Sequence, residues 1–318
     1  MNALARRGHE VTVVNSRFGA DHRIGGVTWT SYERTASPAA DIGVIWRRAW
    51  RVAEVRGAAR RFYLWVHDYV PQSDILPYLK FFAKVMVLSR FHRARYPLIP
   101  SERVFVTANG IDPAQFGQSE SRDHRLMVYG SCYSRGLLEL LTNWRRIRAA
   151  VPGARLNVFY GWQTLQKIRP ERCRRLRHTV EPLLAQRGVT HLGRISHEAV
   201  AGQYSAAGIW AYPCSYPETS CISAMKAQAA GAVPVVIASG ALAETVGFGF
   251  KTMRGYTDFA GLPVPRRRIV EEWLEGLIDM LRSPERQARI RRDMVPISQR
   301  RFAWPHVVEA WEREFQAA

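Results

Sequence analysis

The stretch YPETSCISAMKAQAAGAVPVV, from Tyr216 to Val236, decides the fold prediction. It contains a Tyr-Pro-Glu turn, then small residues that predict a helix at Ser220–Ala230, and then Gly231 before a Pro-Val-Val strand. The apolar run GIWAY, at 208–212, precedes it and predicts another strand. A strand, a helix and a strand in succession are typical of a parallel sheet, and the turn before the helix is typical of a ligand-binding corner.

Short β-branched or aromatic runs recur along the rest of the chain, with helical or turn-rich segments between them. They are VTVV (11–14), IGVIW (42–46), FYLWV (62–66), KVMVL (84–88), RVFVTA (103–108), RLMVY (125–129), RLNVFY (155–160), THL (190–192) and PVVI (234–237). One helix is expected at 137–150, and mostly helical sequence follows from about residue 270. The alternation predicts an α/β protein of two doubly wound, Rossmann-like domains.

The division between the two domains is expected in the polar stretch from Asp112 to Asp123. The first domain is therefore predicted at 1–112 and the second at 113–302, and an amphipathic helix at 303–318 joins the first domain. The chain opens on NALARRGHEVTVV, which predicts the end of a helix, a stop at Gly8 and a strand. The first domain is thus expected to lack an opening strand of its own, because the chain is truncated or because its sheet starts late.

Composition indicates an ordinary globular protein of 318 residues, with 47% hydrophobic and 23% charged residues. No run of about 18 apolar residues could span a bilayer, and no signal-peptide core follows Met1, so a cytoplasmic location is expected. The four cysteines have no CxxC spacing and no histidine at metal-ligand spacing. Free thiols are therefore expected, with no disulfide framework and no metal site.

The net charge of +19 comes almost entirely from arginine. A chain this basic could bind nucleic acid, anionic lipid or a phosphorylated substrate. Three clusters stand out, Arg145-Arg146-Arg148, Arg172-Arg174-Arg175-Arg177 and Arg266-Arg267-Arg268. Solvent-exposed faces of helices or loops explain these clusters most simply. If the clusters bind a partner, an anionic membrane surface is favoured over nucleic acid, because no nucleic-acid-binding module accompanies them. Nucleic acid is not expected as a partner.

Ligands of a doubly wound sheet bind beyond the carboxyl ends of its strands, which selects three loops. The first, YGSCYSRG at Tyr129–Gly136, places backbone N–H groups and Arg135 where a phosphate could bind, although an ordinary turn with a surface arginine fits equally well. In the second, Glu218 precedes a helix that Thr219 or Ser220 could cap; its carboxylate could bind sugar hydroxyls or complement the helix dipole. The third carries His67, which is a polar contact for substrate or a structural histidine.

Taken together, the motifs resemble one family. LARRGHEVTVV, VHD, VLSRFHRARY, VTANGID, GSCYSRG, PETSCISAMKAQAAGAVPVV and ALAETV occur in the order typical of the retaining family 4 glycosyltransferases of GT-B fold. The resemblance spans nearly the whole chain and is most specific between Lys84 and Glu244. It implies two Rossmann-like domains facing a cleft, an acceptor-side N-terminal domain and a nucleotide-sugar-binding C-terminal domain. No GxGxxG or GxxxxGK[ST] motif supports a dinucleotide or P-loop protein instead.

The resemblance also implies roles for individual residues. Arg135 would offset the charge of the leaving diphosphate, His67 would lie at the donor-sugar side of the cleft, and Glu218 is the first glutamate of the EX7E motif. Lys226 stands where the second glutamate is expected, and Ser131 stands where a second phosphate-binding cation is expected. The segment Asn109-Gly110-Ile111-Asp112 would close the first domain. The further donor-binding candidates are Gly130, Arg194, Ile195, Thr219, Ser220, Cys221 and Ile222.

The implied function is transfer of a sugar from a UDP- or GDP-linked donor, without a metal or other cofactor, to a glycan or lipid-linked saccharide acceptor. Bacterial surface polysaccharide synthesis, at the inner face of the plasma membrane, is the expected setting. Two alternatives stay open: a catalytically silent protein that binds nucleotide-sugars or glycans, and a basic membrane-surface adaptor. Lys226 can donate hydrogen bonds but cannot accept them as a glutamate does. It could therefore donate to ribose oxygens, pair with Glu218, or reach a phosphate in place of the cation missing at Ser131.

Overall fold

The structure is a computed structural model that describes residues 1–15, 21–31, 40–117, 122–255 and 266–317. The chain divides into two compact units. The first unit contains Met1–Gly110 and Phe302–Ala318, and the second contains Ile111–Arg301. The predicted linker from Asp112 to Asp123 lies partly outside the described residues. Its described part includes a 3-10 helix, η6 (Pro113–Gln115), which the Asp112 side chain caps.

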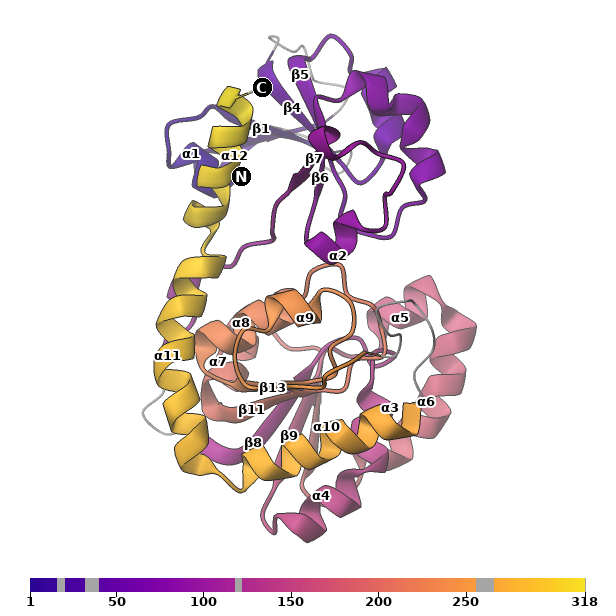
Figure 1. Ribbon diagram of the computed structural model, residues 1–318, viewed down its shortest axis with the longest axis vertical. Helices are drawn as coiled ribbons and strands as arrows, with labels where there is room; N and C mark the ends of the chain where they lie inside the picture. The colour runs from indigo at the N-terminus through magenta and orange to yellow at the C-terminus, as the bar shows by residue number, and fades with distance from the viewer. Residues whose placement is uncertain (16–20, 32–39, 118–121, 256–265, 318) are drawn as a thin grey trace. The chain divides into compact units, whose positions relative to one another are not determined.

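A six-stranded parallel sheet forms the centre of the second unit (Figure 1). Its strands are β8 (Asp123–Gly130), β9 (Arg155–Phe159), β10 (Val189–Gly193), β11 (Ala207–Tyr212), β12 (Val233–Val236) and β13 (Phe250–Lys251). Their spatial order is β10-β9-β8-β11-β12-β13, which is the doubly wound order. All six residues of β11 are buried, as expected of a strand covered on both faces.

Helices connect these strands and cover the sheet. They are α3 (Leu137–Thr142), α4 (Trp144–Ala150), α5 (Gln163–Ile168), α6 (Pro170–Leu184), α7 (His197–Ala206), α8 (Ile222–Ala230), α9 (Leu242–Thr245), α10 (Arg266–Leu281) and α11 (Pro284–Phe302). The prediction of one helix at 137–150 is wrong, because the helix is interrupted at Asn143. The Asn143 amide donates to the Glu139 carbonyl at 2.9 Å, and the Thr142 hydroxyl donates to the Leu138 carbonyl at 2.8 Å. Such side-chain bonds compete with the helical ladder and favour a break.

The first unit contains two sheets. The larger is parallel and has the order β4-β5-β6-β7. Its strands are β4 (Ala40–Trp46), β5 (Ala59–Trp65), β6 (Lys84–Val87) and β7 (Val104–Val106). Short helices connect them: η2 (Ala49–Glu54), η3 (Gln72–Asp74), η4 (Leu76–Phe81), α2 (Arg90–Arg93) and η5 (Ser101–Arg103). The predicted strands of this region are confirmed, as is the α/β class with parallel sheets in two domains.

The smaller sheet has the order β1-β3-β2 and contains the VTVV run. It consists of β1 (Val11–Val14), β2 (His22–Ile24) and β3 (Val27–Thr30), after the short helix α1 (Asn2–Ala5). Strands β2 and β3 were not predicted from the sequence. They form a hairpin whose two loop residues, Gly25 and Gly26, have φ values of 59° and 82°. Two glycines with positive φ suit a type I′ hairpin turn, so the Gly-Gly pair was a usable signal.

The C-terminal helix α12 (Trp304–Ala317) belongs to the first unit, where it lies beside α1 (Figure 1). Its Trp311 packs among Tyr63, Trp65 and Met86 of the parallel sheet and donates a hydrogen bond to the Thr107 hydroxyl at 2.6 Å. Two ion pairs accompany this contact, Arg7 with Glu312 at 2.7 Å and Lys84 with Glu314 at 2.9 Å. Helix α12 therefore completes the hydrophobic core that β5 and β6 form in the first unit.

Candidate functional site

The central strands of the second sheet, β8 and β11, are hydrogen-bonded neighbours and end at the same edge. The chain continues from β8 towards β9 and β10, and from β11 towards β12 and β13, so the order of the strands reverses between them. In doubly wound sheets, ligands bind at such a switch point, beyond the carboxyl ends of the strands. The loops at 131–136 and 213–221 follow these two strands, so the structure brings two of the three predicted ligand loops together.

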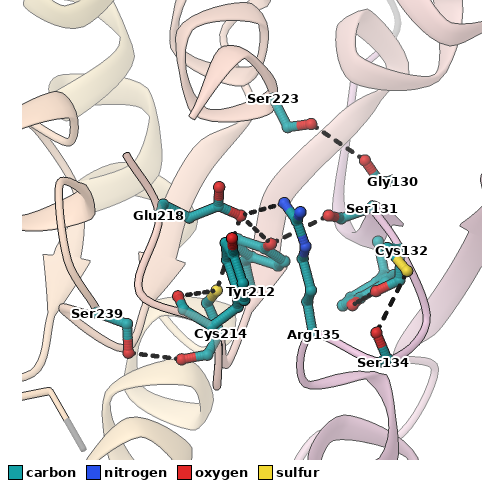
Figure 2. Close-up of polar contacts among 12 residues, drawn as sticks. Gly130, Ser131, Cys132, Ser134, Arg135, Tyr212, Cys214, Glu218, Ser223 and Ser239 are labelled. Atoms are coloured by element: carbon teal, nitrogen blue, oxygen red, sulfur yellow. Dashed lines mark hydrogen bonds and ion pairs between the residues drawn. The ribbon is translucent and has the colours of Figure 1, made fainter. Parts of the chain in front are cut away.

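An ion pair joins the two loops. Arg135 Nη1 lies 2.9 Å from Glu218 Oε1, and the Glu218 side chain is only 7% exposed (Figure 2). The Arg135 guanidinium also lies over the ring of Tyr216, 4.2 Å from its centroid. Burial is the largest single influence on Arg135 and disfavours its charge, but the carboxylate of Glu218 and the smaller contributions of neighbouring groups together outweigh it and raise the pKa of the guanidinium. Arg135 is thus a fixed, permanent cation, and its side chain is 35% exposed at the switch point.

Tyr212, the last residue of β11, holds the same carboxylate oxygen. Its hydroxyl donates to Glu218 Oε1 at 2.8 Å and lies 3.0 Å from the Ser131 hydroxyl (Figure 2). Burial raises the pKa of Tyr212 well above its usual value, so this hydroxyl stays protonated and available as a donor. With its one proton on Glu218, Tyr212 accepts from Ser131. A buried chain of hydrogen bonds therefore runs from the β8 loop to the Glu218 carboxylate.

The helix that follows Glu218 begins later than predicted. Its first residue is Ile222 and its N-cap is Cys221, without a side-chain cap, so the expected cap at Thr219 or Ser220 is wrong. The backbone of Glu218 pairs with Gly240, and its carbonyl accepts from Ala241 N at 2.7 Å. These backbone bonds hold the preceding segment extended, outside the helix.

The first turn of α8 nevertheless lies against the β8 loop. Ser223 donates to the Gly130 carbonyl at 3.2 Å, across the switch point. The Ser220 hydroxyl is shielded from solvent and has no hydrogen-bond partner among the described residues. An unsatisfied buried hydroxyl is unusual in proteins. The uncapped N–H groups at the start of α8, together with this hydroxyl, are suited to an anionic ligand.

The other predicted donor-binding residues lie on α8 and in the loop that follows β10. Lys226 is half-buried in α8, and burial lowers the pKa of its ammonium group. It makes no hydrogen bond or ion pair with any described residue, and the Glu218 oxygen that is hydrogen-bonded accepts from Arg135 and Tyr212 instead. A Lys226–Glu218 pair is therefore absent from this structure. Arg194 is exposed and Ile195 is partly buried, directly after β10.

His67 belongs to the first unit, where it follows β5. Its ring lies 4.2 Å from the Trp65 ring and 5.7 Å from the Trp46 ring, edge-on in both cases. Burial and, to a smaller extent, the charge of Arg47 lower the pKa of His67 to about 4. The imidazole is therefore neutral at neutral pH and presents one donor and one acceptor nitrogen.

The residues that hold these groups in place were not predicted as site residues. Tyr212 was predicted only as the end of a strand, and Tyr216 only as part of a turn. The usable signal was position, since Tyr212 is the last residue of an otherwise apolar run and a tyrosine at a strand's carboxyl end can direct its hydroxyl towards the ligand loops.

Within the described ranges, no three His, Cys, Asp or Glu side chains come together as metal ligands would. The four cysteines are free thiols. Burial raises the pKa values of Cys214 and Cys221, both near Glu218, so neither is a reactive thiolate. No helix in the described parts of the chain is long and apolar enough to cross a membrane.

Comparison with known proteins gives one family match. The family model described as "Glycosyl transferases group 1" matches residues 117–293, which include the switch point and both loops. No curated protein matches the chain by sequence.

Several solved structures share the fold. Sucrose-phosphate synthase from Thermosynechococcus elongatus has a TM-score of 0.71 at 17% identity, over 100% of this chain and 92% of that one. A glycosyltransferase from Rickettsia africae has a TM-score of 0.66 at 13% identity, over 87% of this chain and 76% of that one. HepE from Anabaena, in complex with UDP and glucose, has a TM-score of 0.64 at 15% identity, over 85% and 74%. The predicted GT-B fold is confirmed by these neighbours.

Proposed function

The chain belongs to the group 1 glycosyl transferases, and on that premise we propose that it transfers a sugar from a nucleotide-sugar donor to a glycan or lipid-linked saccharide acceptor. The bond from the anomeric carbon to the diphosphate breaks, and a bond from that carbon to an acceptor oxygen forms. The acceptor proton passes to the departing nucleoside diphosphate. Retention of the anomeric configuration, a hexose donor and independence from metal are parts of the same proposal.

One observation carries this proposal: the Arg135–Glu218 pair at the switch point. Glu218 Oε1 accepts from both Arg135 and Tyr212, whereas no hydrogen bond to Oε2 is formed within the described parts of the chain. Oε2 is the oxygen that would accept a hydroxyl of the donor sugar. The guanidinium uses one of its five N–H groups on Glu218 and can direct others at a diphosphate. Glu218 would thus hold the donor sugar, and Arg135 would hold the diphosphate on the other side of the bond that breaks. A cation at that position stabilises the charge that develops on the leaving diphosphate.

Nucleotide binding is the first test. Thermal unfolding in the presence of UDP, GDP, ADP and their sugar conjugates should show one class of nucleotide that raises the melting temperature. A ligand at 100 times its dissociation constant stabilises the folded state by about 2.7 kcal/mol, which is easily measured. A chain that no nucleotide stabilises would contradict the proposal.

A second candidate is a protein that binds nucleotide-sugar without transferring it, which the lysine at position 226 favours. Release of nucleoside diphosphate from the donor separates the two, because a silent binder would be stabilised by nucleotide but would release none.

Lys226 is proposed to replace the family's carboxylate with a contact to the donor's ribose or diphosphate. Its support is that the ammonium is half-buried in the middle of α8 and has no partner among the described residues. Replacing it by alanine is expected to weaken nucleotide binding by about 10- to 100-fold, the loss of a charged hydrogen bond of about 1.5–3 kcal/mol. Calorimetric titration with UDP and GDP measures the change.

Two further variants make this test specific. Lys226→Glu should bind at least as well as lysine if the site keeps the family's ribose geometry, and should lose binding if Lys226 contacts phosphate. Lys251→Ala is the matched control, because desolvation also lowers the pKa of Lys251, in the second unit, but its ammonium donates to the Ala243 and Val246 carbonyls. Unchanged affinity in both Lys226 variants would remove that residue from the site.

A cytoplasmic setting at an anionic membrane surface, in bacterial surface polysaccharide synthesis, completes the proposal. Its support is the charge of +19 and the arginines exposed on α4, α6 and α10. Some of these arginines are already paired, such as Arg146 with Glu271 at 2.7 Å and Arg174 with Glu171 at 2.9 Å. Because each such pair neutralises an arginine, less positive charge is available to bind anionic lipid.

Sedimentation with phosphatidylglycerol vesicles is therefore expected to weaken steeply as salt rises. Each basic residue at the membrane surface contributes about 1 kcal/mol to the binding free energy, and salt screens this attraction. Replacing Arg172 and Arg175 of α6 by glutamate should weaken it further. Equal binding to neutral phosphatidylcholine vesicles would refute the membrane part of the proposal and leave the transferase part intact.

A further inference from the structure

A groove of about 570 Å³ lies in the first unit, near the amino ends of β5 and β6. This is the edge of the parallel sheet opposite to His67 and the exposed Trp46. The volume is typical of a site for a small molecule. We call it the basic groove. Its lining residues are Val52, Arg56, Ala59, Arg60, Arg61, Phe62, Lys80, Phe81, Phe82 and Ala83.

Four cations line the basic groove, Arg56, Arg60, Arg61 and Lys80, and no lining residue is an aspartate or glutamate. Arg60 forms an ion pair with Asp41 at 3.4 Å, but the two side chains are 78% and 86% exposed. Pairs this exposed neutralise little charge. The other three cations have no carboxylate partner in the parts of the chain that the structure describes. The groove therefore carries a net positive charge.

Two of these cations share one aromatic ring. Arg56 Cζ lies 4.6 Å and Lys80 Nζ lies 5.2 Å from the centroid of the Phe81 ring. Arg61 donates one of its five N–H groups to the Phe315 carbonyl at 3.2 Å. Like charges held this close repel one another, and an anion between them removes the repulsion. The arrangement thus favours a bound anion.

The cations are not needed to satisfy the backbone beside them. Basic side chains near the end of a helix often hydrogen-bond its last carbonyl groups, and η4 ends at this groove. Here Arg103 does so, because its guanidinium donates to the carbonyls of Leu79, Phe82 and Ala83. Arg103 is not one of the lining residues. A structural role at the end of η4 therefore does not explain the lining cations.

We propose that the basic groove binds a phosphate group with two or more negative charges, carried by a soluble phosphate compound or by a lipid headgroup. A phosphate monoester has a charge of about −1.5 to −2 at pH 7, so it offsets more of the cations than a single carboxylate does. The guanidinium of Arg56 can bind its oxygens through paired hydrogen bonds, and the ammonium of Lys80 adds a point charge. The proposal does not depend on the proposed function, because the groove and the switch point belong to different units.

Calorimetric titration with inorganic pyrophosphate at constant ionic strength is the direct test. The wild type is expected to bind it. Arg56→Gln combined with Lys80→Gln should weaken binding by about 10-fold or more, because two hydrogen bonds between charged groups are lost. Arg172→Gln combined with Arg175→Gln is the matched control, since it removes the same charge from exposed positions on α6 of the second unit. The control should bind pyrophosphate as the wild type does.

Two further measurements separate charge from folding. Arg56→Lys keeps the positive charge and should bind pyrophosphate more tightly than Arg56→Gln does. The melting temperature and the nucleotide affinity of the double groove variant should match those of the wild type, which shows that the variant is folded and that the switch point is intact.

Vesicles distinguish the two sources of phosphate. Phosphatidic acid presents a phosphate monoester and phosphatidylglycerol a singly charged diester, so a headgroup ligand predicts that the wild type sediments better with phosphatidic acid and that the double groove variant loses this preference. Groove-dependent binding of pyrophosphate without such a preference identifies a soluble ligand. The proposal is refuted if the wild type neither binds pyrophosphate nor prefers phosphatidic acid. It is also refuted if the double groove variant behaves as the wild type does, or if the control loses as much binding as the groove variant.

Discussion

Replacing Arg135 by alanine is expected to lower donor turnover by about 10- to 1000-fold. Loss of a charged hydrogen bond and of charge stabilisation at the leaving diphosphate together cost about 1.5–4 kcal/mol in the transition state. The carboxylate of Glu218 would also stay buried without its cation, which disfavours the folded site. Release of nucleoside diphosphate from the donor measures turnover, and urea unfolding of the same variant shows how much of the loss is structural.

Tyr212→Phe is the companion variant. It removes a hydrogen bond to the ionised carboxylate of Glu218 and leaves every formal charge in place. A hydrogen bond to a charged group contributes about 1.5–3 kcal/mol, so turnover should fall by roughly 10- to 150-fold if the whole loss is expressed in the transition state. If Arg135→Ala kept the turnover of the wild type, Arg135 would not contact the diphosphate. A larger loss of turnover in Tyr212→Phe than in Arg135→Ala would show that the hydroxyl contributes more to transfer than the cation does.

Replacing Gly136 by alanine is expected to destabilise the second unit by about 2–5 kcal/mol. Gly136 has a φ of 115°, which costs an L-residue about 1–2 kcal/mol, and an added Cβ would collide with the backbone carbonyl of Pro213. The collision lies between the two loops of the switch point, so nucleotide binding should weaken as well. Urea unfolding measures the stability, and titration with the nucleotide that stabilises the wild type measures binding.

Gly193→Ala separates the two causes. Gly193 also has a positive φ, of 63°, and belongs to the same unit, but an added Cβ there would meet no atom within 4 Å. Its cost should therefore be only the backbone term of about 1–2 kcal/mol. Equal destabilisation by the two substitutions would mean that the loops do not pack as closely as the structure has them.

The strands were predictable from sequence where burial is complete. GIWAY and LMVY are continuous apolar runs because β11 and the end of β8 are covered on both faces. The hairpin of β2 and β3 was missed because both strands are short and β2 is exposed, so the hairpin has no clear hydrophobic period. The break at Asn143 was missed because it depends on side-chain bonds to the preceding turn, and periodicity is insensitive to these.

The candidate site was predictable by residue type but not by contact. Arg135 and Glu218 stand out as charged residues in loops after strands, yet their 2.9 Å ion pair depends on β8 lying next to β11. Local sequence predicts strands and does not fix their spatial order. The exposed position of Trp46 was missed for a related reason: it ends an apolar strand, and its partner Trp65 is buried under a helix from the other end of the chain.

The proposed function requires that this chain release a nucleoside diphosphate from a nucleotide-sugar at the switch point of its second unit. The most direct measurement is the release of UDP, GDP or ADP from a panel of their sugar conjugates, by the wild type and by Arg135→Ala, with methyl glycosides as acceptors. We expect release from one donor class by the wild type and a loss of about 10- to 1000-fold in the variant. No release from any donor, or equal release by both proteins, would contradict the account.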